Sequence, residues 1–95
     1  MKLEFTTRAL AQIERIQAYL AAHNPAAAPR VVERIHAVAR RLEAHPWSGH
    51  PTRRREFRVV LASPFPYLLS YTVVNDTVTI LRVRHTSRRP LASTR

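Results

Sequence analysis

The sequence predicts an α+β domain with the order β-α-α-β-β-β, in which an N-terminal strand and an αα-hairpin precede a three-stranded antiparallel meander. Two consecutive stretches repeat apolar residues at helical spacing. The runs that follow them are rich in Val, Ile, Leu, Tyr and Thr, and the last two runs meet at Asn75-Asp76, a pair that tolerates a tight turn. We therefore expect the helices to pack on one face of the sheet, within one domain over residues 1–90.

The first expected strand is Lys2-Leu3-Glu4-Phe5, which alternates polar and apolar residues and should pair with a later strand. Thr6 or Thr7 can cap the helix that follows, because either hydroxyl accepts a hydrogen bond from a free amide of the first turn. This helix extends to about Ala22. Its apolar face consists of Ala9, Ile13, Ile16 and Leu20.

The second expected helix begins at Pro25 or at Pro29, since proline fits the first turn but crowds the helix interior. A short break separates it from the first helix, so the two should form an antiparallel αα-hairpin. Its apolar stripe consists of Val31, Val32, Ile35, Val38, Ala39 and Leu42. We interpret both helices as core and scaffold.

The segment from His45 to Thr52 contains two prolines and the only glycine of the chain, so we expect a loop with no regular element. Trp47 should pack back on the helices, as a lone Trp in a loop usually does. His45 and His50 make a poor metal pair, because no Cys and few carboxylates lie near them. We expect no metal and no cofactor.

The third part of the chain predicts three strands. In the first, Phe57, Val59 and Leu61 share one face, and Arg58 and Val60 share the other. The second and third form a hairpin, in which we assign the two tyrosines Tyr67 and Tyr71 to structure. Strict alternation in the last strand groups Val78 and Ile80 with Arg82 and Arg84, and Thr79 and Leu81 with Val83 and His85. We expect a mobile tail over residues 91–95.

The charge is strongly positive. Sixteen basic residues, fifteen of them Arg, stand against six acidic ones and give a net charge of +10. From Arg53 onward nine Arg face Glu56 and Asp76, so +7 of this charge lies in the second half. This imbalance predicts an acidic protein partner, nucleic acid, or both. No apolar run approaches the length of a signal peptide or a membrane span, so we expect a soluble cytoplasmic protein.

The last part of the chain contains Pro66-Tyr67-Leu68-Leu69-Ser70-Tyr71, followed by Ile80-Leu81-Arg82-Val83-Arg84-His85-Thr86-Ser87-Arg88-Arg89-Pro90. These two segments resemble the C-terminal hairpin of the RelE/ParE toxin superfamily, and of its ParE-like branch in particular. The resemblance extends over about Leu3 to Pro90. It implies the toxin of a type II toxin-antitoxin module, which binds and poisons DNA gyrase and forms a hetero-oligomer with a small acidic antitoxin. On this analogy the binding residues are Arg53, Arg54, Arg58, Arg84, His85, Arg88 and Arg89.

An alternative within the superfamily is a RelE-like endonuclease that cuts mRNA on the ribosome. Such an enzyme needs a base for the 2′-hydroxyl, cations for the phosphate and an acid for the leaving oxygen. The candidates are Glu56 and His85 for proton transfer, with Arg58, Arg84 and Arg88 for the phosphate. The chain departs from the RelE-like pattern, because Thr86 follows the histidine and no Tyr occurs after Tyr71. These departures favour the ParE-like interpretation.

A second alternative is a basic nucleic-acid-binding module. The net charge of +10 supports this interpretation. Against it, the sequence has neither a recognition-helix pattern nor a platform rich in aromatic residues. Such a module would bind arbitrary duplex DNA with an affinity that falls steeply as salt increases.

Overall fold

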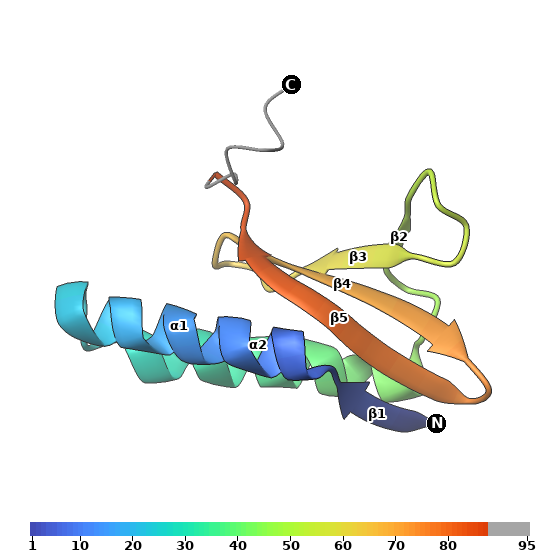
Figure 1. Cartoon of the computed structure of the whole chain (residues 1–95), viewed down its shortest axis with the longest axis horizontal. Helices are drawn as coiled ribbons and strands as arrows, with labels where there is room; N and C mark the ends of the chain where they lie inside the picture. Colours follow the sequence, from blue (N-terminus) through green and yellow to red (C-terminus); the bar gives the residue numbers. More distant parts are fainter. Residues whose placement is uncertain (88–95) are drawn as a thin grey trace.

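The computed structural model describes residues 1–87 of the chain, so the expected tail and the candidate residues Arg88 and Arg89 lie outside the described residues. Two long helices lie side by side along one face of a twisted sheet, and within residues 1–87 the opposite face of the sheet carries no helix (Figure 1). The elements are β1 (Lys2–Phe5), α1 (Thr7–His23), α2 (Ala27–Ala44), β2 (His50–Pro51), β3 (Arg58–Leu61), β4 (Tyr67–Val74) and β5 (Thr77–His85).

The strands form one sheet in the order β1-β5-β4-β3-β2. The N-terminal strand β1 runs parallel to β5, and every other neighbouring pair is antiparallel. The β4–β5 turn places both central residues at positive φ, 51° for Asn75 and 58° for Asp76, as a type I′ hairpin requires. The expected α+β class, the αα-hairpin and the pairing of the N-terminal strand with a later strand are confirmed.

The sheet has one more strand than expected. We expected no regular element between His45 and Thr52, but His50 and Pro51 pair with Val59 and Arg58 as the two-residue strand β2. The proline is tolerated because β2 lies at the edge of the sheet, where a missing amide interrupts no further ladder.

The helix boundaries follow from capping. The Thr6 hydroxyl accepts a hydrogen bond from the Ala9 amide at 3.0 Å, so this threonine is the N-cap of α1. Helix α2 begins at Ala27, between the two proline positions that the sequence offered. Pro29 is therefore the third residue of the helix, where the amide that proline lacks would have no intrahelical partner.

The last strand contains an irregularity that the sequence pattern did not predict. Tyr71 pairs with Ile80 and Ser70 pairs with Arg82, so Leu81 is an extra residue in β5. Such a bulge reverses the alternation of the side chains beyond it. The expectation that the arginines of β5 share a face with Val78 and Ile80 was therefore wrong. Val83 enters the core instead and is 2% exposed.

The N-cap and the second turn of α1 bond to peptide groups of β5 that lie at the bulge and beyond the end of β1. Strand β1 ends at Phe5, opposite Ile80, so the outer edge of β5 beyond this point faces α1. There the Thr6 hydroxyl donates to the Leu81 carbonyl at 3.0 Å, and the Val83 amide donates to Gln12 Oε1 at 2.7 Å. Beyond the end of β1, the start of α1 thus supplies the hydrogen-bond partners that a neighbouring strand would otherwise give to β5.

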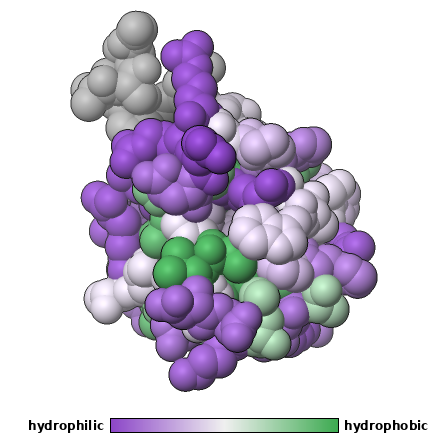
Figure 2. Space-filling view, turned by 90° about the vertical axis from the view of Figure 1, so that its right-hand side faces the viewer, coloured by the Kyte–Doolittle hydropathy of each residue, from purple (hydrophilic) through white to green (hydrophobic). Residues whose placement is uncertain are grey.

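The hydrophobic core lies between the helices and the sheet. Alternate residues of β4 point into it, and Tyr67 and Tyr71, which we assigned to structure, are 4% and 0% exposed. The end of the molecule that holds the β4–β5 turn is mostly hydrophilic, with one small hydrophobic patch (Figure 2). Within residues 1–87, neither helix is long and apolar enough to cross a membrane. The largest fully buried side chains are Tyr71, Ile35, Leu42, Leu69, Ile80, Val78 and Val83.

We predict that Gln12→Met destabilises the fold by about 1–3 kcal/mol, because it leaves the Val83 amide without an acceptor in a partly buried place. Gln17→Met is the matched control, since Gln17 is exposed on the same helix and the change should stay within about 0.5 kcal/mol. Urea unfolding of both variants measures the difference. Equal midpoints for the two variants would show that the Gln12 hydrogen bond contributes nothing.

Candidate binding site

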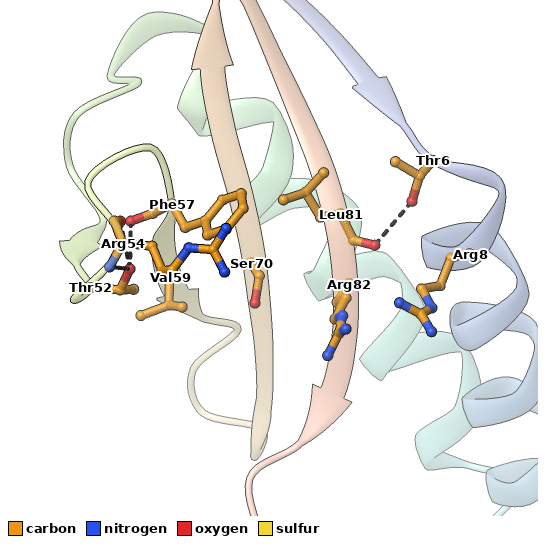
Figure 3. Close-up of a pocket in the computed structure, with 9 residues that line it drawn as sticks. All are labelled: Thr6, Arg8, Thr52, Arg54, Phe57, Val59, Ser70, Leu81 and Arg82. Atoms are coloured by element: carbon orange, nitrogen blue, oxygen red, sulfur yellow. Dashed lines mark hydrogen bonds between the residues drawn. The ribbon is translucent and has the colours of Figure 1, made fainter. Parts of the chain in front are cut away.

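A groove with a volume of about 610 Å³ opens on the face of the sheet opposite helices α1 and α2. Its walls come from distant parts of the chain: the start of α1, the loop before β3, and strands β3, β4 and β5 (Figure 3). The lining residues are Thr6, Arg8, Thr52, Arg54, Phe57, Val59, Ser70, Leu81 and Arg82.

Strand pairing explains which side chains reach the groove. Val59 pairs with Ser70, and Ser70 pairs with Arg82, so these three side chains lie in a row on the open face. Leu81 lies beside this row at the bulge. The Thr52 hydroxyl accepts from the Arg54 amide at 3.1 Å and is 3.0 Å from the Phe57 carbonyl, which holds the loop against the groove.

The groove combines an apolar floor with positive walls. Arg54 lies on the β3 side, and Arg8 and Arg82 lie on the α1 side (Figure 3). Among the described residues, no Asp or Glu lines the groove. The Arg54 guanidinium lies 4.9 Å from the centre of the Phe57 ring and 4.0 Å from Glu56 in an exposed ion pair. Such a groove suits a ligand that carries carboxylates or phosphates next to apolar groups.

The basic residues that the sequence suggested do not form one surface. Arg54 lines the groove, and Arg84 is exposed on the same face, opposite Leu68 of β4. Arg53 is exposed in the loop before β3. Arg58 instead pairs with Tyr71 and points to the helix side of the sheet. Arg88 and Arg89 lie outside the described residues.

Sequence analysis missed two arginines of the groove. Strict alternation placed Arg82 on the other face of β5, and only the bulge turns it to the groove. Arg8 follows the N-cap of α1, and the contact between α1 and β5 brings it to the sheet. The only indication in the sequence was the pair Thr6-Thr7, which predicts where α1 begins. It does not predict that the start of α1 lies beside β5.

The candidates for a nuclease site are spread across the molecule. Arg58 lies opposite Tyr71, and His85 lies opposite Tyr67, four residues earlier in β4. This is a separation of about 13 Å along the strand. Glu56 pairs with Arg54 in the loop. The described residues also include no group of three or more His, Cys, Asp or Glu that could hold a metal ion. The candidates Glu56, Arg58 and His85 therefore do not share one site.

His85 is occupied by local contacts at the end of β5. Its ring meets the Tyr67 ring edge-on, with centroids 5.2 Å apart. Its Nδ1 accepts a hydrogen bond from the Ser87 amide at 3.0 Å. The ring is half-buried, so it contributes to the surface at this end of the strand.

The α2–β2 loop is held by two side chains of the sheet. The Arg58 guanidinium donates to the carbonyls of Trp47 at 3.1 Å and Gly49 at 2.7 Å. The Tyr71 hydroxyl donates to the Pro46 carbonyl at 2.8 Å and accepts from the Gly49 amide at 3.0 Å. Burial raises the pKa of Tyr71 above its ordinary value of 10.0, so the hydroxyl keeps its proton at neutral pH and can donate.

These bonds turn Trp47 away from the core. We expected this residue to pack on the helices, but its side chain is 61% exposed, with the Arg58 guanidinium 5.1 Å from the ring centre. The expectation was wrong because Arg58 and Tyr71 hold the peptide groups on both sides of the tryptophan. With the backbone held in this way, the indole points outward and lies against the guanidinium.

Comparisons with known proteins agree with this fold. The family model described as ParE toxin of type II toxin-antitoxin system, parDE, matches residues 3–90. Y4kP of Sinorhizobium fredii is 37% identical over 84 residues, which cover 88% of this chain and 86% of that protein. Toxin RelE2 of Caulobacter vibrioides is 33% identical over 84 residues, 88% of this chain and 93% of that protein.

A solved structure confirms the architecture independently. A chain of the chromosomal ParDE TA system from P. aeruginosa aligns with a TM-score of 0.82 and covers 92% of this chain and 97% of that chain. The two sequences are 22% identical. This likeness establishes the shared fold.

We predict that Gly49→Ala destabilises the fold by about 1–3 kcal/mol. A Cβ atom at this position would collide with the Tyr71 hydroxyl and lie 2.8 Å from the Val59 carbonyl oxygen, which belongs to rigid backbone. Ser48→Ala is the matched control, because Ser48 is exposed in the same loop. Thermal unfolding followed by circular dichroism compares the two variants. An unchanged midpoint for Gly49→Ala would contradict the close approach of loop and sheet.

Proposed function

The chain belongs to the ParE toxin family of type II toxin-antitoxin systems, and from this premise we propose that it inhibits growth by binding and poisoning DNA gyrase until a cognate acidic antitoxin neutralises it. The single observation that carries the antitoxin part is the groove. It joins three arginines to an apolar floor and, within the described part of the chain, has no acidic residue in its lining. Both partners would place the protein in the cytoplasm.

The groove suits a segment in which Asp or Glu alternates with apolar residues. The carboxylates of such a segment would meet Arg8, Arg54 and Arg82, and its apolar side chains would cover Phe57 and Leu81. Exposed ion pairs contribute little by themselves, so the apolar floor would supply affinity and the arginines would supply orientation and a fast encounter. The exposed pair between Arg54 and Glu56 can exchange partners at small cost for the same reason.

For the gyrase contact we propose the end of β5 and the sequence beyond it. Arg84 is exposed and His85 is half-buried at this end, and Arg88 and Arg89 follow in the sequence. The sequence also suggested Arg53 and Arg58 as binding residues. They lie in the loop before β3 and at the first residue of β3, away from the end of β5. The separation of Glu56, Arg58 and His85 supports a toxin that acts by binding over one that cuts mRNA, within the residues that the structure describes.

We predict that Arg82→Glu weakens the complex with the antitoxin by about tenfold or more, because a like charge then faces the acidic segment in the groove. The small acidic protein encoded beside this chain should co-purify with the wild type, and isothermal titration calorimetry gives the affinities. Arg40→Glu is the control, since Arg40 is exposed on α2, and it changes the net charge equally. Equal weakening by both variants would mean that only overall charge matters.

We also predict that the purified chain, freed from its partner, stops gyrase from supercoiling relaxed plasmid in the presence of ATP. For the double variant Arg88→Ala with Arg89→Ala, the concentration that gives equal inhibition should be roughly tenfold higher, because removing arginines from an interface typically weakens binding by this amount. The variant Arg30→Ala with Arg40→Ala removes the same charge from α2 and should behave as wild type. Growth arrest by a chain that leaves gyrase untouched would refute gyrase as the target and redirect attention to the ribosome.

A further inference from the structure

Trp47 is the only tryptophan of the chain, and the structure holds it in place on the surface. Four hydrogen bonds with Arg58 and Tyr71, three donated by these side chains and one accepted by the Tyr71 hydroxyl, fix the peptide groups at Pro46, Trp47 and Gly49. The indole itself is 61% exposed and contributes little to the core. A large aromatic side chain in a pre-ordered loop loses little entropy on binding, so this arrangement favours a role in recognition.

The surroundings of Trp47 are positive. The Arg58 guanidinium lies against the ring, 5.1 Å from its centre. A second cavity of about 280 Å³ begins in the same loop and continues between α2 and β3. Arg34, Arg41 and His45 line it, and none of its lining residues in the described chain is Asp or Glu. Arg34 Nε donates to the Ser63 carbonyl at 2.6 Å, which holds this guanidinium at the rim.

We propose that Trp47 and this cavity bind single-stranded or locally unpaired nucleic acid. A base stacks on the indole, whose ring is already polarised by the Arg58 cation, and the adjoining phosphates contact Arg34 and Arg41. Stacking on aromatic side chains beside a positively charged groove is the usual design of single-strand binding sites. The second alternative from the sequence, a nucleic-acid-binding module, lacked an aromatic platform, and Trp47 supplies one aromatic residue for it.

Nucleic acid fits this surface better than an acidic protein does. A tryptophan that anchors a protein interface usually lies among apolar neighbours that exclude water. Here its chain neighbours His45, Ser48 and His50 are polar and exposed. The apolar residues nearby belong to the lining of the adjoining cavity, which does not include Trp47; they are Val38, Leu42, Val60 and Leu61. The α2–β2 loop lies at the end of the molecule that faces the viewer in Figure 2, where strongly hydrophobic side chains form one small patch and the rest is hydrophilic or of intermediate hydropathy.

This surface is separate from the groove. Arg58 points to the helix side of the sheet, whereas Val59 beside it points into the groove on the open face. An antitoxin segment in the groove would therefore leave Trp47 free. The inference does not depend on gyrase as the target, because binding is measured with the chain alone.

The chain has one tryptophan and three tyrosines. When it is excited at the red edge of the absorption band, where tyrosine does not absorb, its fluorescence reports on Trp47 alone. We expect oligothymidylate of about ten nucleotides to quench this emission in a saturable way, since a stacked base lies against the indole. A duplex of equal length should quench it less, because its bases are already stacked. Emission that stays constant while the labelled oligonucleotide binds would overturn the proposal and leave only unspecific attraction between charges.

Substitutions at Trp47 test stacking directly, and the exposed position makes misfolding a small risk. By fluorescence anisotropy of a labelled oligothymidylate, Trp47→Leu should bind about tenfold more weakly, whereas Trp47→Phe should keep most of the affinity because it keeps an aromatic face. Tyr19→Leu is the control, because Tyr19 is 42% exposed on α1 and should have no effect. Wild-type affinity of Trp47→Leu would refute the stacking role.

A polyanion without bases separates nucleic acid from acidic protein. Poly-glutamate at equal charge concentration should displace the oligonucleotide only weakly and should leave the Trp47 emission nearly unchanged. If poly-glutamate quenches the emission and competes as well as oligothymidylate does, the surface serves an acidic protein segment and the proposal is wrong.

Discussion

The bulge at Leu81 is the constraint on which both the core and the groove depend. One extra residue between Ile80 and Arg82 reverses the faces of β5 halfway along the strand. Val83 consequently reaches the helices, and Arg82 reaches the open face. Without the bulge, a charged side chain would be directed at a dry core, where an unpaired cation is very costly. The same local irregularity therefore completes the hydrophobic layer and supplies a wall of the groove.

Residues far away in the sequence stabilise this bulge, which explains why the sequence pattern did not predict it. The Leu81 carbonyl and the Val83 amide find their partners in Thr6 and Gln12, more than 70 positions earlier in the chain. Local periodicity does predict the two helices and the turn at Asn75-Asp76, because their causes lie within a few residues. An irregular strand whose stability comes from another element leaves no such local signal.

The position of Trp47 was missed for the same reason. Loop composition alone suggests a tryptophan folded back on the core, but Arg58 and Tyr71 decide its direction from the strands. Gly49 permits this arrangement, since any side chain there would collide with Tyr71. The sequence shows the only glycine of the chain between two prolines, which identifies a loop; it cannot show which strand residues approach that loop.

The loop before β3 and the first residue of β3 place on opposite sides of the sheet charges that the sequence presents as one cluster. The run from Arg53 to Arg58 reads as a single basic segment, yet Arg54 contributes to the groove and Arg58 to the opposite side. The net charge of +10 is therefore distributed over at least two surfaces with different chemistry. One is the groove with its apolar floor, and the other is the loop in which Arg58 lies against the Trp47 ring. Because charge alone attracts any polyanion, the apolar and aromatic groups beside the arginines must supply the discrimination between partners. If an antitoxin segment occupies the groove as proposed, the loop that carries Trp47 still faces solvent on the other side of the sheet.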